Sequence, residues 1–404
     1  MNKPIIPVVF AANNNFTLFS YVAIYSLIKN TSPSNIYKIY ILETDLTDNN
    51  QRMLESLTQE NVTVKCIDIS GFTADVELKG SMHLSQETYY RLWIPLIFPE
   101  YEKILYLDSD MCILSDVAEL YEVEIGNYAA GAVQDVVCHG LQGHTESIGL
   151  ADVKETFNAG VLLINAVEFE KQKIREKCLA LLAEDYKREE RRLVFADQDA
   201  LNIVLYENHY RLDEKWNCQP LYLWRMEEVM DGWKEKYIFA QDHAAIMHFS
   251  GDRKPWDNPE LPKADVFWKW AKEADVIEKL ITKLMNNIRN REDKLECFDV
   301  FKFPYKQIPC DSKVVIYAAG RVGKTFYNQL KMSEYAQIVL WVDRNWEKID
   351  DVFEVKPVES IKKTDFDYLL IAVESFKIAE DVRKMLKDMQ IPEEKIIWDE
   401  YRKM

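Results

Sequence analysis

The sequence predicts an α/β protein in which parallel strands alternate with helices. From the N-terminus onward, short β-rich segments alternate with segments whose apolar residues recur at helical spacing. The same alternation starts again near residue 312, after a stretch with a different pattern. A chain of 404 residues is long enough for two or three domains. Helices between successive strands imply parallel pairing, with ligands bound at the carboxyl ends of the strands.

The first third of the chain contains four predicted strands and the helices between them. Apolar residues at helical spacing predict a helix over residues 18–28, and Thr47 is expected to cap a second helix over residues 49–57. Residues 85–98 are expected to be helical with a bend at Pro95. The predicted strands are rich in β-branched and aromatic residues and cover residues 7–10, 37–42, 62–67 and 103–107.

A second α/β region follows a helical connector. Its predicted strands and helices cover residues 313–317, 322–331, 338–342, 368–373 and 378–389. We therefore expect one domain at residues 1–262, a helical segment and linker at 263–310, and a second domain at 311–404.

Composition and charge exclude several classes of protein. Hydrophobic residues make up 48% and charged residues 29% of the chain, which is typical of globular proteins and excludes extensive disorder. The net charge of −17 argues against nucleic acid as a partner, because phosphate binding is largely cationic. The seven cysteines are scattered and form no C-x-x-C pair, which fits a reducing compartment and argues against a cysteine-based zinc site.

The sequence also favours a cytoplasmic protein. It contains no run of about 20 apolar residues that would span a membrane, and Pro4 and Pro7 interrupt the apolar N-terminus where a secretory signal would lie. The aromatic residues within 267–270 suggest weak peripheral contact with the inner face of the membrane. An ordinary amphipathic helix explains the same pattern, and we favour it.

Two carboxylates one residue apart carry the strongest chemical signal. Asp108 and Asp110 lie between the apolar runs 103–107 and 111–114, and an extended backbone would project both to the same side. Two like charges beside a buried strand are costly unless a cation neutralises them. A divalent metal with oxygen ligands would do so and could also hold a diphosphate. A surface turn after a strand is the alternative.

Six sequence blocks in order resemble family 8 glycosyltransferases, the family of glycogenin and of bacterial lipopolysaccharide galactosyl- and glucosyltransferases. The resemblance covers about the first two-thirds of the chain. It implies a GT-A fold with a mixed central sheet, a UDP-sugar donor, a divalent metal and retention of anomeric configuration. The blocks are residues 10–16 (FAANNNF), 90–92 (YRL), 106–110 (YLDSD), 157–165 (FNAGVLLIN), 197–202 (DQDALN) and 248–256 (HFSGDRKPW).

The resemblance assigns donor-binding roles to residues in these blocks. It implies that Asn13 and Asn15 bond the uridine and that Phe16 stacks on its base, although the family often has acids at the first two Asn positions and Tyr in place of Phe16. It places Arg91 over the donor phosphate or sugar, while the residues themselves equally suggest pairing with an acid. The remaining expected donor contacts are Ala11, Ala12, Asp108, Ser109, Asp110, Asn158, Ala159 and Gly160.

The block at 248–256 completes the expected metal site. The resemblance makes His248 the third protein ligand beside Asp108 and Asp110, whereas an isolated histidine after an apolar run is more often structural. A mixed nitrogen and oxygen site favours Mn²⁺ over Mg²⁺. Gly251 permits close backbone approach, and Lys254 supplies a charge for the diphosphate. The other five histidines are expected to be structural.

The block at 197–202 is expected to carry the catalytic residues. The resemblance places Asp197 and Gln198 against the donor sugar, whereas Asp197 alone reads as a helix N-cap. A carboxamide is a poor nucleophile, so we favour front-face displacement, in which the departing UDP oxygen takes the acceptor proton. Asp199 is the alternative nucleophile. Asp135 and residues 217–219 are expected on the acceptor side.

The C-terminal region contains an incomplete dinucleotide-binding fingerprint. Residues 314–323 (VVIYAAGRVG) end a strand and open a helix, and Asp343 follows at the end of the next strand. Ala318 replaces the first glycine, so NAD is not expected. The segment resembles small Rossmann-like domains appended to bacterial sugar-modifying proteins.

The function expected is transfer of glucose or galactose from UDP-glucose or UDP-galactose to a hydroxyl of a glycan or lipid-linked acceptor, in lipopolysaccharide or capsule biosynthesis. One alternative is a nucleotide-sugar-binding protein whose C-terminal domain carries out NAD-dependent sugar oxidoreduction. Another is a non-catalytic nucleotide-sugar sensor, which would need a broken metal site. The C-terminal domain would serve docking, homo-oligomer formation or regulation.

Overall fold

The computed structural model describes residues 3–79, 85–135, 142–229, 232–251, 253–258, 261–291, 301–349 and 354–399. The chain divides into two compact units, Met1–Phe267 and Trp268–Met404. The three-part division expected from the sequence, with its connector at 263–310, stays a prediction.

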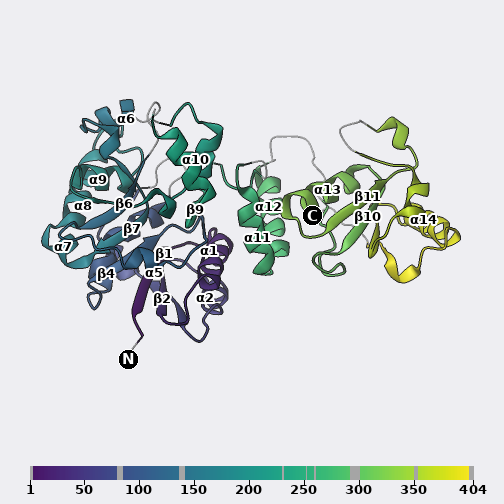
Figure 1. Ribbon diagram of the computed structural model, residues 1–404, viewed down its shortest axis with the longest axis horizontal. Helices are drawn as coiled ribbons and strands as arrows, with labels where there is room; N and C mark the ends of the chain where they lie inside the picture. Colours follow the sequence, from purple (N-terminus) through teal and green to yellow (C-terminus); the bar gives the residue numbers. More distant parts are fainter. Residues whose placement is uncertain are drawn as a thin grey trace. The chain divides into compact units, whose positions relative to one another are not determined.

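The first unit is built on a mixed seven-stranded sheet with the order β3-β2-β1-β4-β7-β6-β8 (Figure 1). The first four strands are parallel, as the alternating pattern predicts. β7 runs antiparallel to both β4 and β6. The strands are β1 (Ile5–Ala11), β2 (Ile36–Glu43), β3 (Val62–Asp68), β4 (Lys103–Leu107), β6 (Ala130–Gln134), β7 (Phe157–Asn165) and β8 (Tyr210–Arg211).

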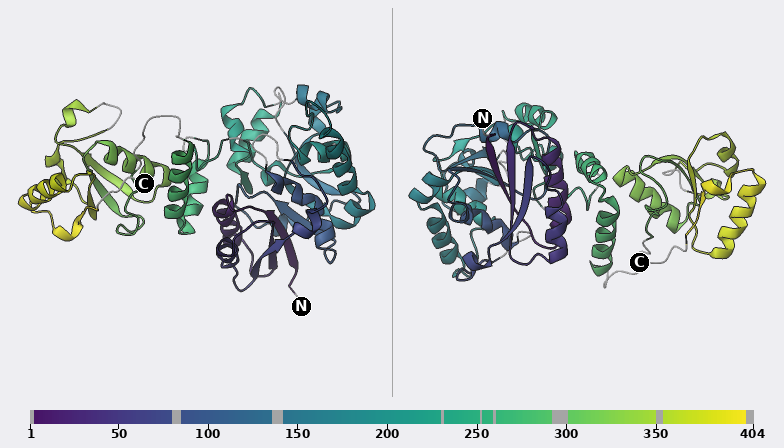
Figure 2. Two further views of the ribbon diagram at one scale, coloured as in Figure 1. Left: turned by 180° about the vertical axis from the view of Figure 1, so that it is seen from behind. Right: turned by 90° about the horizontal axis from the view of Figure 1, so that it is seen from below.

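Strand β1 shows how the sheet separates two apolar layers. Val8 and Phe10 point into one core cluster, whereas Val9 and Ala11 point into another, because successive side chains of a strand face opposite sides. Helices therefore cover both faces of the sheet (Figures 1 and 2). Helix α1 (Thr17–Lys29) buries Ile24 and its neighbours in the first cluster.

The structure tests two predictions about helices of the first unit, the cap at Thr47 and the helix at residues 85–98. Thr47 caps helix α2 (Asp48–Glu55), accepting a hydrogen bond from Asn50 N. Residues 85–98, expected to be helical with a bend at Pro95, form a 3-10 helix, η1 (Gln86–Trp93), followed by one turn of α-helix, α4 (Ile94–Ile97). The other helices of this unit are α3 (Ser70–Thr73), α5 (Ala118–Tyr121), α6 (Gln142–Ser147), α7 (Ala166–Lys171), α8 (Ile174–Asp185), α9 (Asp197–Val204) and α10 (Lys234–Asp242), with 3-10 turns at Val153–Glu155, Glu214–Trp216 and Pro220–Trp224.

A small second sheet joins segments far apart in the sequence. Strand β5 (Met111–Ile113) pairs antiparallel with β9 (Ile246–His248), and Met111 lies opposite His248. The chain between β4 and β5 bends at residues 109–110, so the condition of an extended backbone, under which both acids would project to one side, is not met. The pairing places the bend next to the end of β9.

The second unit contains a four-stranded parallel sheet with the order β11-β10-β12-β13. Three of its strands match the predicted ones, and the fourth, two-residue strand was not predicted. The helix α11 (Ala264–Glu273) spans the junction of the units. The other elements are α12 (Ile277–Arg291), β10 (Lys313–Tyr317), α13 (Arg321–Ser333), β11 (Gln337–Val342), β12 (Tyr368–Ile371), α14 (Phe376–Asp388) and β13 (Ile396–Ile397), with 3-10 turns at Trp346–Lys348, Val358–Lys363 and Glu393–Lys395.

Within the described residues, no helix is long and apolar enough to cross a membrane. Phe267, one of the aromatic residues considered for membrane contact, is buried and packs on Trp256 with ring centroids 5.0 Å apart. The buried Phe267 side chain therefore does not contribute to a membrane contact. The peripheral contact with the membrane stays a hypothesis that rests on the other residues of this segment.

Candidate active site

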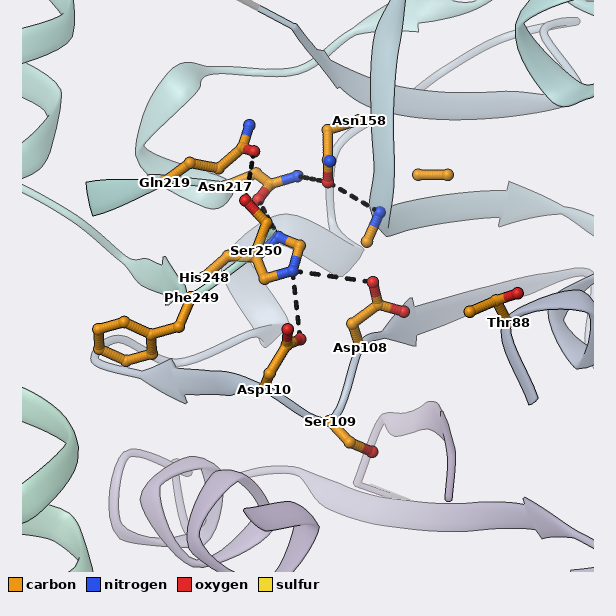
Figure 3. Close-up of polar contacts among 12 residues, drawn as sticks. Thr88, Asp108, Ser109, Asp110, Asn158, Asn217, Gln219, His248, Phe249 and Ser250 are labelled. Carbon is orange, nitrogen blue, oxygen red and sulfur yellow. Dashed lines mark hydrogen bonds and ion pairs between the residues drawn. The ribbon is translucent and has the colours of Figure 1, made fainter. Parts of the chain in front are cut away.

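Two acids and a histidine converge where β4, β5 and β9 meet (Figure 3). Asp108 follows β4, Asp110 precedes β5, and His248 ends β9. The antiparallel pairing of β5 with β9 continues one step beyond the strands, since Phe249 N donates to the Asp110 carbonyl oxygen at 2.9 Å. The backbone itself therefore holds Asp110 beside His248.

The three side chains point toward one another. His248 Nε2 lies 3.2 Å from Asp110 Oδ1 and 3.8 Å from Asp108 Oδ2. One ligand atom from each residue lies within 4.8 Å of the others. His248 is 2% exposed, so the imidazole has no route to reorient toward solvent. Such a spacing lets one cation contact all three groups.

Gly160 on β7 leaves the space these side chains need. A Cβ atom placed there would overlap His248 Cε1 and would lie 2.8 Å from Asp108 Oδ2. Any side chain at this position would push the histidine and the carboxylate away, so a glycine is required. Gly160 was expected as a donor contact, which stays a prediction; its role in making room for His248 and Asp108 was not predicted.

Lys254 and His248 flank the Asp110 carboxylate. Its burial opposes ionisation, but Lys254 and then His248 outweigh that cost and hold the pKa of Asp110 well below its ordinary value. The Lys254 ammonium contacts Asp110 Oδ2 and also donates to the Phe249 carbonyl oxygen at 2.7 Å. Lys254 therefore lies at the candidate metal site, and its expected contact with a diphosphate stays a prediction.

The site fits a divalent metal by its donor set. His248 Nδ1 lies 2.8 Å from Asn217 Oδ1, which leaves Nε2 as the nitrogen facing the two carboxylates. Metal-bound histidines typically bond their other ring nitrogen in this way. Two carboxylate oxygens and one imidazole nitrogen are a donor set suited to Mn²⁺.

Arg91 is buried and pairs with two acids. Its Nε lies 2.8 Å from Asp197 Oδ2, and its Nη2 lies 3.2 Å from Asp108 Oδ1. Nη1 also donates to the Ala159 carbonyl oxygen. Of the two expectations for this residue, pairing with an acid is confirmed, and the guanidinium also ties the metal-site acid to helix α9.

Asp197 is the first residue of α9, and Ala196 occupies the N-cap, so the N-cap alternative for Asp197 is wrong. Burial raises the pKa of Asp197 to about 6, although the Arg91 guanidinium favours the charged form. A carboxyl group of this kind titrates near neutral pH.

Gln198 lies against strand β7. Its Oε1 accepts from the Ala159 backbone N–H at 3.0 Å and from Asn158 Nδ2 at 3.2 Å. Asn158 in turn bonds Asn217, which bonds His248. The blocks at 157–165, 197–202 and 248–256 are thus joined in one polar network. Three separate sequence segments form a single site.

Comparison with known proteins settles the family of the first unit. Residues 7–260 match the family model described as glycosyl transferase family 8. The chain belongs to this family. The matched range contains every residue of the network above. Residues 310–397 match a second family model, described as C2185-like, N-terminal.

The relatives agree with the family model. The chain is 27% identical to General stress protein A of Bacillus subtilis (strain 168) over 66% of its own length and 93% of the relative. It is 27% identical to glycosyltransferase GlyE of Streptococcus pneumoniae over 65% of its own length and 60% of that protein. The solved structure of the galactosyltransferase LgtC, in complex with donor and acceptor sugar analogues, matches with a TM-score of 0.53 at 23% identity, covering 66% of this chain and 96% of that one. That likeness shows the fold, which is GT-A.

In this family 8 domain, the loop after β1 (residues 12–16) is held by hydrogen bonds within the protein. Asn13 Oδ1 accepts from the backbone N–H groups of Asn15 and Phe16, and Asn13 Nδ2 donates to Glu87 Oε2 at 3.1 Å. Asn15 is exposed. Of the two asparagines expected to bond a uridine, Asn13 already uses both ends of its amide within the protein. Their contacts to a nucleotide stay a prediction.

The small residues after β1 adjoin the metal-site bend. Ser109 Oγ donates to the Ala11 carbonyl oxygen at 2.8 Å, and Ala12 is buried. The end of β1 and the turn between Asp108 and Asp110 are therefore held together, which places the expected nucleotide loop beside the expected metal site.

Asp199 is turned away from that network. Its Oδ2 accepts from Phe195 N at 2.8 Å, and both its oxygens lie 3.0 Å from His144 Nε2. His144 was expected to be structural, and its pairing with Asp199 was not foreseen, because no local motif links positions so far apart. Asp199 remains the alternative nucleophile only as a prediction.

Residues 217–224 run beside the loop that carries His248. Gln219 Oε1 accepts from Ser250 Oγ at 2.6 Å, and a Cβ atom on Gly251 would lie 3.0 Å from Leu221. Gly251 has a φ of +85°, which favours glycine. Asn217 contacts His248, and its expected place on the acceptor side stays a prediction.

The turn at the end of β10 keeps a glycine-like backbone without the first glycine. Ala318, which replaces it, has a φ of +84°, and a Cβ atom on Gly323 would overlap the Ala318 carbonyl oxygen. Asp343 Oδ2 accepts from Ala319 N at 2.8 Å, and its Oδ1 accepts from Asn345 N at 2.7 Å. The carboxylate that would read a ribose in a dinucleotide site is thus engaged by the protein backbone.

Proposed function

We propose that this family 8 glycosyltransferase is a retaining, metal-dependent enzyme that transfers glucose or galactose from a UDP-sugar to a hydroxyl of a glycan or lipid-linked acceptor. The observation that carries the proposal is the convergence of the partly buried Asp108 and Asp110 on the buried His248, in a cluster joined to Gln198. The family and the GT-A fold support a nucleotide-sugar donor and a glycan acceptor.

Asp108, Asp110 and His248 would hold the metal, and Mn²⁺ fits the nitrogen and oxygen donors better than Mg²⁺. The metal, when bound, supplies charge stabilisation for the departing diphosphate. Lys254 lies against Asp110 and adds a second positive charge at the same place. Both charges would act on the departing UDP, which gains negative charge as the bond between the anomeric carbon and the phosphate oxygen breaks.

The acids of helix α9 are poorly placed to act as nucleophiles. Asp197 is paired with Arg91, and Asp199 is bonded to His144 and to the backbone. Gln198 has its oxygen held on β7, so its carboxamide would orient the donor sugar without attacking it. This arrangement supports front-face displacement, in which the acceptor oxygen bonds the anomeric carbon while the departing UDP oxygen takes its proton.

The test is a donor panel with the full chain. UDP-glucose, UDP-galactose, UDP-N-acetylglucosamine and GDP-mannose are each incubated with Mn²⁺, and nucleoside diphosphate release is measured with and without glycan acceptors. We expect release from UDP-glucose or UDP-galactose, increased by an acceptor. Release from GDP-mannose alone would contradict the proposed donor class.

A further inference from the structure

Asn217 lies between the metal site and Gln198, and both ends of its amide are used (Figure 3). Its Nδ2 donates to Asn158 Oδ1 at 2.9 Å, and its Oδ1 lies 2.8 Å from His248 Nδ1. The side chain is buried, being 4% exposed, so neither bond is exchanged for one with bulk water. Its orientation therefore matters to both neighbours.

A backbone N–H group determines which ends of the Asn158 and Asn217 side-chain amides are oxygen and which are nitrogen. Gly160 N lies 3.0 Å from the Asn158 side-chain atom that Asn217 also contacts. A backbone N–H can only donate, so that atom of Asn158 is its oxygen. The Asn217 atom facing it must then be the NH₂ group. The other end of Asn217, facing His248, must be the oxygen.

The Asn217 oxygen determines which ring nitrogen of His248 carries a proton. Because Asn217 presents an oxygen, His248 Nδ1 must carry the hydrogen of that bond. In the neutral imidazole, the lone pair then lies on Nε2, the nitrogen that faces Asp108 and Asp110. This is the tautomer that a metal ligand needs at this position.

The other end of the network is anchored in the same way. Gln198 Oε1 accepts from the Ala159 backbone N–H, so the atom it presents to Asn158 is an oxygen, and Asn158 donates its NH₂ group to it. Two successive backbone N–H groups of β7 thus orient the amides on both sides of Asn217. The Gln198 nitrogen is left as the end directed away from these bonds.

We propose that Asn217 is a positioning residue that sets the tautomer and ring orientation of His248 and couples the metal site to the placement of Gln198. The proposal rests on the proposed function, because it takes His248 as a metal ligand. It assigns no contact between Asn217 and substrate. Asn217 acts only through its two neighbours.

Two substitutions separate the two bonds. Asn217→Leu removes both and should weaken Mn²⁺ binding by about 10- to 100-fold, the effect typical of losing a partner that orients a metal ligand. Asn217→Asp keeps an oxygen for His248 Nδ1 but offers no N–H to Asn158. It should bind Mn²⁺ at least as tightly as the natural chain while turnover falls by about 10- to 100-fold through misplacement of Gln198.

Mn²⁺ affinity is measured by calorimetry on the full, metal-stripped chain without any donor, and turnover is measured as UDP release. Ser250→Ala is the matched control, since it removes a hydrogen bond between the same two segments but outside this network. It should leave the Mn²⁺ dissociation constant unchanged. Circular dichroism checks the folding of every variant.

A second measurement is made on the natural chain, and a variant serves only to assign the signal. ¹⁵N chemical shifts of histidine in the chain loaded with Zn²⁺, a diamagnetic substitute for Mn²⁺, should show His248 protonated at Nδ1 and unprotonated at Nε2. The His248→Asn variant assigns the signal. A proton on Nε2, or natural Mn²⁺ affinity in a folded Asn217→Leu, would overturn the role in setting the tautomer.

Natural turnover in Asn217→Asp would overturn the coupling to Gln198. If the natural chain binds Mn²⁺ but releases no UDP from any UDP-sugar, the proposed function fails, while the ¹⁵N shifts and the Mn²⁺ affinities still decide the positioning role. If the natural chain binds no Mn²⁺, both the metal assignment and this inference are wrong.

Discussion

At the scale of single residues, Arg91 links two acids of the candidate active site through ion pairs. One buried guanidinium contacts Asp197 on α9 and Asp108 at the end of β4. Both acids face the same positive charge, and burial makes ionisation costly for Asp197. Charging Asp197 is therefore unfavourable enough to bring its pKa near 6.

This shift predicts how stability depends on pH. The pKa of Asp197 is about 6 in the folded chain against an ordinary value of 3.8, so the folded state binds the proton more tightly. The contribution is fully present below about pH 4 and is lost as the pH rises through 6, an effect on the order of 3 kcal/mol. Urea unfolding between pH 4 and 7 of the natural chain and of Asp197→Asn measures it. Identical pH profiles for the two proteins would contradict this role of Asp197.

Gln198→Ala should lower kcat by about 10- to 1,000-fold while UDP affinity changes little, because the proposed contact is to the sugar at the reaction centre. UDP binding by calorimetry and turnover by UDP release measure the two effects separately. Equal losses of turnover and UDP affinity would mark Gln198 as a nucleotide-binding or structural residue instead.

At the scale of elements, strand β7 shapes the metal site through Gly160. Gly160→Ala should weaken Mn²⁺ binding, because the added Cβ atom would overlap His248 and crowd Asp108. Calorimetric titration with Mn²⁺ measures the loss. Gly71→Ala is the matched control, since a Cβ atom at Gly71 meets no atom within 4 Å. Natural Mn²⁺ affinity in Gly160→Ala would show that the ligands are not held where the structure places them.

Features that depend on a short stretch of sequence were predicted correctly. Strand β4 and the acids after it were found because an apolar run followed by paired carboxylates is a local pattern. The contact of Asn217 with His248 was not predicted, since it depends on how distant segments lie side by side. The His144–Asp199 pair was missed for the same reason.

Short sequence patterns also could not predict that β7 runs antiparallel to its neighbours. Nor could they predict that the helix around Arg91 is a 3-10 helix. Strand direction depends on which neighbour a segment meets, and residue periodicity does not encode it. The GT-A fold and the metal triad came from the resemblance of six separated blocks. The structure supplies their geometry.

At the scale of the whole molecule, every residue of the candidate site lies in the first compact unit, Met1–Phe267. We predict that a fragment of residues 1 to 295 keeps basal UDP-sugar hydrolysis, because the second unit has its own sheet and core. UDP release by the fragment is compared with that of the full chain. A fragment that is folded by circular dichroism yet inactive would show that the second unit contributes to the active site.

The central claim is that Asp108, Asp110 and His248 bind the metal on which sugar transfer depends. The most direct measurement is UDP release from UDP-glucose or UDP-galactose by the metal-stripped full chain as Mn²⁺ is added back, beside Asp110→Asn. We predict saturable activation of the natural chain and a loss of at least about 100-fold in the variant. Undiminished UDP release by the metal-stripped chain, or by a folded Asp110→Asn, would contradict the account.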